Sequence, residues 1–390
     1  MMRDPLFLIL ILIAVESLVL GLSANHKTKH LFKILPSMFW IYFLPMVLST
    51  CGVIDARHPV YQEITKYLLP PALFLMLIDM DIESIVRLGP SALIMFFSGT
   101  LGILFGMVVS FIIFKPFIGT LFWGGFGALA ASWTGGSANM IAVKEALNTP
   151  ENVFLPMVIV DTILPYTWLG IVIFCAGRQK DFDAWNHSDR RILDDLAKQG
   201  AGSDKNKENK PQAPVILFVS ILLAFLVSLV ARRVAVFFPT GKAVLSPSAW
   251  TIILVTASAI ILSMTPIKQV ASSRTHLAGK WILYLVLASI GARASLSNAS
   301  QVGILLLAGV VVIAVHVLVL LIVARLIRAP LFLAATASLS NIAGLVSAPV
   351  VAEIYQPGLA SVGLLLAILG HSIGVYNGIL TGHICRLFMT

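Results

Sequence analysis

The sequence has little charge. Asp, Glu, Lys and Arg make up 12% of its 390 residues, whereas 58% of the residues are hydrophobic. Soluble domains carry about 25% charged residues, so the composition excludes that class and predicts an all-α polytopic integral membrane protein. The net charge of +9 does not indicate nucleic-acid binding, because most Lys and Arg residues lie at the ends of apolar runs, where they orient spans and contact lipid headgroups.

Cysteine is also scarce, and motifs of enzymes are missing. Cys51, Cys175 and Cys385 are far apart, which excludes a disulfide framework or a metal site built on closely spaced cysteines. No nucleotide-binding motif, His/Cys/Glu metal spacing or G-x-S-x-G elbow occurs. We therefore expect no enzyme, no cofactor and no nucleotide-driven transport by this chain. An intramembrane serine hydrolase that uses Ser137 and His371 stays as an alternative of another class.

Apolar runs long enough to span a membrane are abundant. A transmembrane helix needs roughly 17–25 residues, and the sequence predicts about 12 (11–13) such helices. The runs fall near 6–22, 32–50, 66–80, 91–114, 120–146, 152–176, 213–238, 248–265, 277–295, 301–327, 330–354 and 358–385.

A polar segment divides the chain. Residues 177–212 hold eight of the 27 basic and seven of the 18 acidic residues, which predicts a soluble linker with a surface helix over 181–198 and a flexible tail. It separates a first repeat (1–176) from a second (213–390). With twelve spans, 18 Lys and Arg lie on the side of both termini and 9 on the other, so we expect cytoplasmic termini in a bacterial inner membrane.

The two parts resemble each other in the same order. "PSMFW" (36–40) matches "PSAW" (247–250), "AASWTGGSANM" (130–140) matches "TASLSNIAGLV" (336–346), and "DTILPY" (161–166) matches "HSIGVY" (371–376). Transporters are commonly built from such repeats, with the site between them. Six spans in each part give parallel repeats, whereas inverted repeats require an odd number or an extra crossing.

The matched segment around residues 132–140 interrupts an apolar run with glycines, hydroxyls and an amide. Glycines let the backbone leave helical geometry, and the freed backbone and side-chain oxygens can bind an ion or a substrate. The alternative is close helix packing through small residues. The candidate residues at the two interruptions are Ser132, Thr134, Gly135, Gly136, Ser137 and Asn139, with Ser338, Ser340, Asn341, Gly344 and Ser347.

Asp161 lies inside a predicted span. A charge there is costly, which favours a functional role, either as a Na⁺ ligand or as a proton carrier. The alternative is a structural hydrogen bond to a neighbouring helix. Thr162 lies beside Asp161. His371 occupies the matching position in the second repeat, where it titrates, pairs with Asp161 or fills space as a neutral ring, with Tyr376 and Asn377 as polar lining. Glu16 and His316 also lie in apolar runs, but they have no matching partner and rank lower.

Two of these stretches carry a family resemblance. "SWTGGSANMIAVKEAL" (132–147) followed by "VDTILPY" (160–166) resembles the DUF819, or YjcL-like, family of membrane proteins. The resemblance implies the cation:proton antiporter and anion transporter superfamily. It also implies an elevator with two crossed broken helices and a core built from 91–176 and 301–386. Asp161 then corresponds to the ion-binding aspartate, although Val160 beside it departs from the acidic pair of electrogenic antiporters.

We therefore expect a secondary active transporter. It would use Na⁺ or H⁺ to move a small solute, with an anion among the options, by alternating access. A monovalent cation/proton antiporter is the alternative within transport, and a channel or sensory membrane protein is another. The expected partners are the solute, the coupling cation, the lipid bilayer and a second copy in a homodimer.

Overall fold

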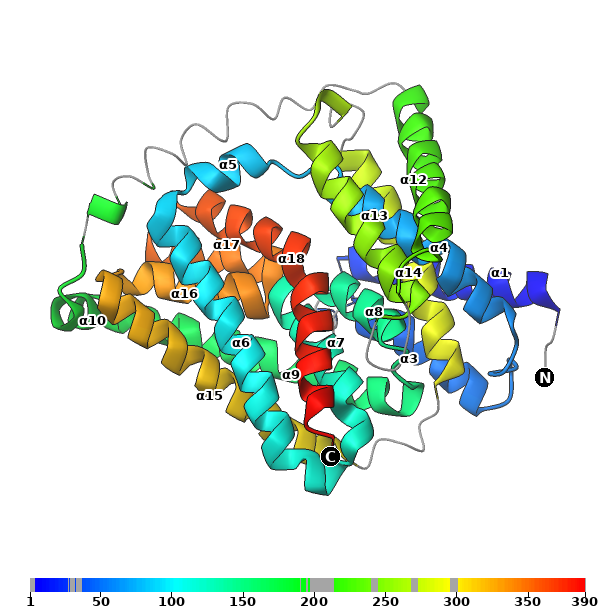
Figure 1. Ribbon diagram of the computed structural model, residues 1–390, viewed down its shortest axis with the longest axis horizontal. Helices are drawn as coiled ribbons and strands as arrows, with labels where there is room; N and C mark the ends of the chain where they lie inside the picture. Colours follow the sequence, from blue (N-terminus) through cyan, green and yellow to red (C-terminus); the bar gives the residue numbers. More distant parts are fainter. Residues whose placement is uncertain are drawn as a thin grey trace. The chain divides into compact units, whose positions relative to one another are not determined.

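The computed structural model is helical. It describes residues 4–26, 28, 32, 37–189, 191–193, 196, 214–239, 245–267, 273–294 and 301–389, and each regular element in them is a helix (Figure 1). In this part of the chain, seven helices are long and apolar enough to cross a membrane. They are α1 (Pro5–Ala24), α6 (Gly89–Ile118), α9 (Glu151–Cys175, continued to Asn186), α12 (Pro214–Ala235), α14 (Ser273–Arg293), α15 (Val302–Ile327) and α18 (Ala360–Leu387).

Each predicted apolar run corresponds to a helix or to an interrupted pair of helices. The shorter ones are α3 (Ser37–Thr50), α4 (Val60–Leu77) and α13 (Pro247–Ser263), and the pairs are α7 (Trp123–Gly135) with α8 (Ser137–Ala146) and α16 (Leu331–Ile342) with α17 (Gly344–Tyr355). α4 begins at Val60, before the predicted start, and contains Pro70 and Pro71 in its interior. The number of membrane crossings stays a prediction.

The order of the long elements is the same in both parts of the chain. Three helices are followed by a long helix, an interrupted helix and another long helix. The first series is α1, α3, α4, α6, α7/α8 and α9, and the second is α12, α13, α14, α15, α16/α17 and α18. This order is what a sequence repeat would produce.

The chain folds into two compact units. Unit 1 comprises residues 1–79, 148–162 and 212–302, and unit 2 comprises 80–147, 163–211 and 303–390. Unit 1 takes the first three helices of each series, and unit 2 takes the interrupted helices with their long neighbours. α9 belongs to both units, because the division falls between Thr162 and Ile163.

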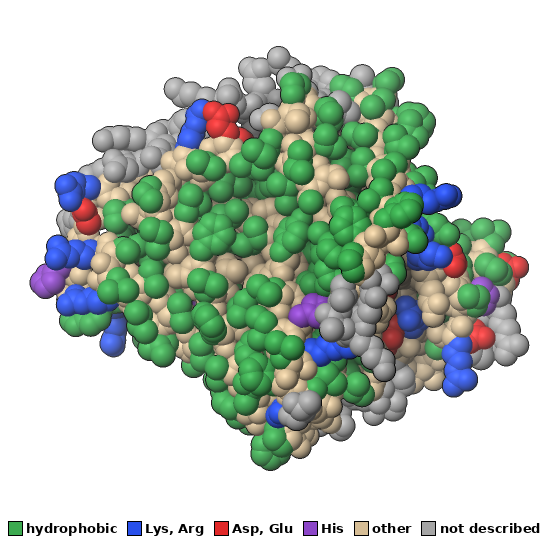
Figure 2. All heavy atoms as spheres, viewed as in Figure 1, with side chains coloured by type: hydrophobic (Ala, Val, Ile, Leu, Met, Phe, Trp, Pro, Cys, Tyr) green, Lys and Arg blue, Asp and Glu red, His purple; other side chains and the backbone are tan. Residues whose placement is uncertain are grey.

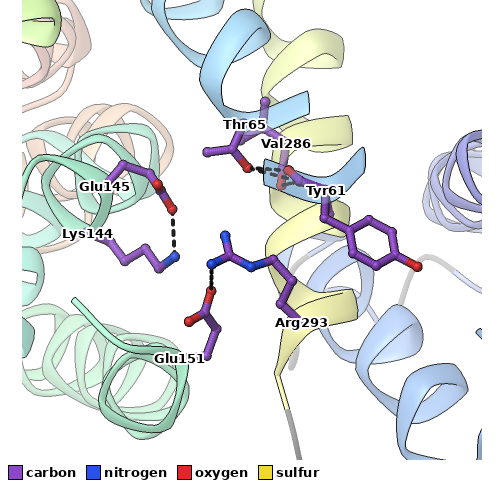
Figure 3. Close-up of polar contacts among 8 residues, drawn as sticks. Tyr61, Thr65, Lys144, Glu145, Glu151, Val286 and Arg293 are labelled. Atoms are coloured by element: carbon purple, nitrogen blue, oxygen red, sulfur yellow. Dashed lines mark hydrogen bonds and ion pairs between the residues drawn. The ribbon is translucent and has the colours of Figure 1, made fainter. Parts of the chain in front are cut away.

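Unit 1 is packed around α14, which contacts α3 and α4. A Cβ atom at Gly291 would lie 2.1 Å from the Tyr42 carbonyl oxygen, so α14 and α3 are in backbone contact. Arg293 forms a 3.0 Å ion pair with Glu151 at the start of α9, and the Thr65 and Ser289 hydroxyls lie 3.2 Å apart (Figure 3). Separately, in unit 2, the buried Lys144 pairs with Glu145 at 2.6 Å.

Unit 2 is held together by the packing of α18 on α7. Gly370, Gly374, Gly378 and Gly382 recur every fourth residue along α18. A Cβ atom at Gly370 would lie 2.3 Å from the Thr134 carbonyl oxygen, and one at Gly378 would lie 2.7 Å from the Gly127 carbonyl oxygen. Small residues at this spacing let membrane helices approach closely.

Many large hydrophobic side chains are exposed on the helices. On α12 they follow a helical spacing and include Phe218, Leu222, Leu226 and Leu229. Hydrophobic side chains are also spread widely over the face in view in Figure 2. Apolar patches of this extent are unusual on soluble monomers, which supports the assignment as an integral membrane protein.

The start of the linker is a docked helix. α10 (Gln179–Asn186) ends well before the predicted 198, and it packs against the start of α16. Asp183 Oδ1 accepts a 2.8 Å hydrogen bond from the Leu331 amide, and Asn186 Nδ2 donates to the Ala329 carbonyl at 2.8 Å. The tail predicted to be flexible (199–212) lies outside the described residues.

Candidate functional site

The first candidate stretch is a helix interruption. α7 ends at Gly135 and α8 begins at Ser137, with Gly136 between them at φ 89° and ψ 172°. Only glycine adopts this backbone readily, which explains its place in the sequence. Gly135 has a different role, since a Cβ atom there would lie 2.5 Å from the Gly370 carbonyl oxygen.

Polar side chains tie this interruption to α18, a helix of the second series. Asn139 Nδ2 donates to the Gly135 carbonyl at 2.8 Å and to the His371 carbonyl at 3.0 Å. The His371 ring donates from Nδ1 to the Gly135 carbonyl at 2.8 Å. Asn377 Nδ2 donates to the Thr134 hydroxyl at 2.7 Å. These bonds join two parts of the chain that are far apart in sequence.

The second candidate stretch is also a helix interruption. α16 ends at Ile342, and α17 begins at Gly344, where φ is 64°. α16 contacts α6, α7 and α18 within unit 2, and α7 contacts α17 as well. The two interrupted helices therefore pack against each other in the same unit.

The second interruption is tied to α6, a helix of the first series. Asn341 Nδ2 donates to the Phe96 carbonyl at 3.2 Å and to the Ala337 carbonyl at 3.0 Å, while its Oδ1 accepts from Thr100 at 2.8 Å. Ser340 instead donates to the Thr336 carbonyl of its own helix at 2.7 Å. Asn139 and Asn341 thus each bond a backbone carbonyl of the other series.

The remaining candidates in unit 2 differ in burial. Ser132 and Ser347 are buried, whereas Ser137 and Tyr376 are half-buried. Gly136 and Gly344 are half-buried as well, so each interruption is more accessible than the helices beside it.

Asp161 and Thr162 are assigned to a different unit from the other candidates. Both belong to unit 1, at the end of the part of α9 that this unit contains. Asp161 is half-buried, and Thr162 is buried and donates to the Val158 carbonyl of its own helix at 2.8 Å. The structure brings the other candidate residues together in unit 2, and the role of Asp161 beside them stays a prediction.

Two residues that bind the candidate stretches, Trp168 and Thr100, were not singled out by the sequence. Trp168 donates from Nε1 to the Ser338 hydroxyl at 2.9 Å, and His316 contacts the same hydroxyl through Nε2 at 2.9 Å. His316 was considered because it lies in the middle of an apolar run, but it ranked lower because it has no matching residue. Asn377 was expected as polar lining beside Tyr376.

Each interruption exposes helix ends of opposite polarity. The carbonyl end of α7 lies beside the amide end of α8, and the carbonyl end of α16 lies beside the amide end of α17. Carbonyl ends attract cations and amide ends attract anions. Among the described residues, no group of three or more His, Cys, Asp or Glu side chains could hold a metal ion.

Comparison with known proteins identifies the family of this chain. Residues 10–388 match the family model described as "Protein of unknown function (DUF819)". The chain is also similar to the uncharacterized membrane protein YjcL of Bacillus subtilis (strain 168), with 28% identity over 119 residues. That match covers 30% of this chain and 30% of the relative. The chain belongs to the DUF819 family of membrane proteins.

Proposed function

We propose that this protein is a secondary active transporter that uses a Na⁺ or H⁺ gradient to move a small solute by alternating access. One observation carries the proposal: helices are interrupted at corresponding positions of the two series, and the interrupted helices pack together in unit 2. Broken helix pairs of this kind bind substrates and ions in transporters. In the proposal, the twelve helical segments are membrane spans in two repeats.

The chemistry of the interruptions favours an anionic solute with a coupling cation. The accessible amide end of α8, with the Ser137 hydroxyl beside it, suits an anion. Hydroxyl, amide and carbonyl oxygens suit Na⁺, for which Asp161 is the proposed charged ligand or, alternatively, the proton carrier. The residues need no further cofactor for this role.

In the proposal, the two units are the parts that move relative to each other during transport. Unit 2 holds both interruptions and serves as the transport domain, while unit 1 serves as the scaffold. α9 is continuous through both units, so it is the segment through which an elevator movement would be transmitted. We further propose an inner-membrane location with cytoplasmic termini and assembly as a homodimer.

The test is a flux assay in proteoliposomes with a pH-sensitive dye inside. A panel of small carboxylates, amino acids and inorganic anions is added outside, with Na⁺ or K⁺ as the cation. A symporter shows saturable, solute-dependent proton or Na⁺ entry, and preloaded unlabelled solute accelerates the exchange of labelled solute.

The alternatives give different results in the same preparation. A cation/proton antiporter moves protons when Na⁺, K⁺ or Li⁺ is added without any solute. A channel shows flux that does not saturate and no accelerated exchange. A serine hydrolase reacts at Ser137 with a fluorophosphonate. Any of these results in place of solute-dependent coupling would contradict the proposal.

A further inference from the structure

A chain of hydrogen bonds links four helices inside unit 2. The His316 ring on α15 is fully buried, with Nδ1 2.8 Å from the Gly99 carbonyl oxygen of α6 and Nε2 2.9 Å from the Ser338 hydroxyl of α16. The Trp168 indole on α9 donates to the same hydroxyl at 2.9 Å. The chain therefore runs from α9 through α16 and α15 to α6.

The groups at the two ends of this series, the Gly99 carbonyl and the Trp168 indole, determine where the hydrogens of a neutral His316 ring and of the Ser338 hydroxyl lie. A backbone carbonyl only accepts, so Nδ1 of His316 carries the hydrogen that bonds Gly99. An indole N–H only donates, so Trp168 occupies a lone pair of Ser338. With a neutral ring, Nε2 is the acceptor, and the Ser338 hydroxyl donates its hydrogen to it.

Close packing holds the ring in this position. A Cβ atom at Gly99 would lie 3.1 Å from His316 Cε1, and one at Gly102 would lie 2.9 Å from His316 Cα. α6 and α15 are therefore in close contact at the ring, and both ring nitrogens are already hydrogen-bonded. The Ser338 hydroxyl can rotate about its C–O bond, so it can accommodate a change in the protonation of the ring.

We propose that His316 is a proton-operated positioning residue, which sets the direction of the Ser338 hydroxyl and thereby the strength of the bond to Trp168. When the ring takes a proton from water, Nε2 changes from acceptor to donor. Ser338 then accepts from both His316 and Trp168, and its own hydrogen turns toward its helix or toward a bound ligand. The charged donor competes with the indole for the same oxygen, so the Trp168 bond weakens.

The helices around this site carry other charged and titratable groups. α18, which contacts both α6 and α16, carries His371, Tyr376, His383, Cys385 and Arg386. α16 carries no Asp, Glu, Lys, Arg or His. On α6 the charged residue is Lys115, which donates to the Phe388 carbonyl at 2.6 Å near the helix end, and on α15 it is Arg325, which donates to the Trp185 carbonyl at 2.8 Å. α9 carries Glu151, Asp161, Tyr166 and Cys175 besides Trp168.

Asp161 lies on the same helix as Trp168, the residue at the α9 end of the series of hydrogen bonds. It precedes Trp168 by seven residues on α9, which places both side chains on the same face, about 10 Å apart along the axis. A proton at His316 therefore acts on the helix that also carries the proposed coupling residue.

The test is the indole N–H signal of Trp168 in the full-length protein, labelled with ¹⁵N-tryptophan and reconstituted in lipid nanodiscs. Trp168→Phe identifies the signal by its loss. In the wild type, we expect this signal to shift as the pH is lowered. His316→Gln and Ser338→Ala should each abolish that shift, because one removes the titrating group and the other removes the link.

A second tryptophan provides the matched control. The Trp123 ring lies 6.3 Å from the His383 ring between centroids, so its signal should titrate in the wild type and keep its titration in His316→Gln. If His316→Gln does not fold, Ser338→Ala decides, because it leaves the histidine in place. A Trp168 signal that does not change with pH in the wild type, or that still shifts in Ser338→Ala, would overturn the proposal.

Discussion

The Asn139 side-chain amide donates to the His371 backbone carbonyl at 3.0 Å, although the two residues are 232 positions apart in sequence. The same amide nitrogen donates to the Gly135 carbonyl. One side chain therefore holds the end of α7 against α18. Asn341 does the equivalent between α16 and α6.

Replacing either asparagine should loosen unit 2. Asn139→Ala and Asn341→Ala each remove two hydrogen bonds from a side-chain amide to buried carbonyls, which should cost about 1–3 kcal/mol of stability. Thermal unfolding in detergent measures this cost. Thr167→Ala is the matched control, because Thr167 is exposed and donates only within its own helix. Equal unfolding temperatures for all variants and the wild type would contradict the role of the asparagines.

The glycines of α18 should tolerate no side chain. In Gly378→Ala, the new Cβ atom would lie 2.5 Å from the Ala131 Cβ atom, so α18 must move away from α7 at a cost of about 1–3 kcal/mol. Gly170→Ala on α9 is the control, because nothing lies within 4 Å of its Cβ position. The thermal unfolding temperature should be lower for Gly378→Ala than for Gly170→Ala. Equal unfolding temperatures would contradict the importance of the contact between α18 and α7.

The docked part of the linker and its tail should respond differently to change. Asp183→Ala removes the acceptor for the Leu331 amide at the start of α16, which should cost about 1 kcal/mol. Asp181→Ala on the exposed face of α10 should have little effect.

Replacing residues 199–212 with a flexible linker of adequate span should preserve stability and flux, because that segment is polar and lacks apolar periodicity. Loss of flux with normal expression would contradict this expectation.

Much of the helical layout could be predicted from the sequence, because lipid-spanning helices need long apolar runs. The glycines and polar residues at 135–139 marked the first interruption, and Gly344 lies in the second. Tertiary partners were harder to predict. The contact of Asn186 with the Ala324 carbonyl spans 138 residues, and no local pattern indicates it.

The histidines illustrate the same limit. His371 was favoured because the repeat aligned it with Asp161, and its ring does bond the first interruption. His316 had no aligned partner, yet its ring contacts Ser338 of the second stretch. Which face of α15 meets α16 depends on packing, and an apolar helix of nearly uniform composition does not reveal this. The four-residue glycine spacing on α18 was visible in the sequence, but its partner helix was not.

Asp161 is the residue on which the proposed ion coupling depends most directly. Asp161→Asn keeps the size and one carbonyl oxygen but removes the charge. Removing a half-buried charge also removes its desolvation cost, so the variant should fold. Asp189→Asn, which replaces a half-buried linker aspartate paired with Arg191, is the control.

The deciding measurement is gradient-driven flux of the wild type and Asp161→Asn in matched proteoliposomes, together with binding of labelled Na⁺ to the purified proteins. The account predicts that Asp161→Asn is folded and inserted like the wild type but loses the dependence of flux on Na⁺ or H⁺, while Asp189→Asn keeps it. Transport by Asp161→Asn with unchanged ion dependence would contradict the account and leave Asp161 a structural residue of α9.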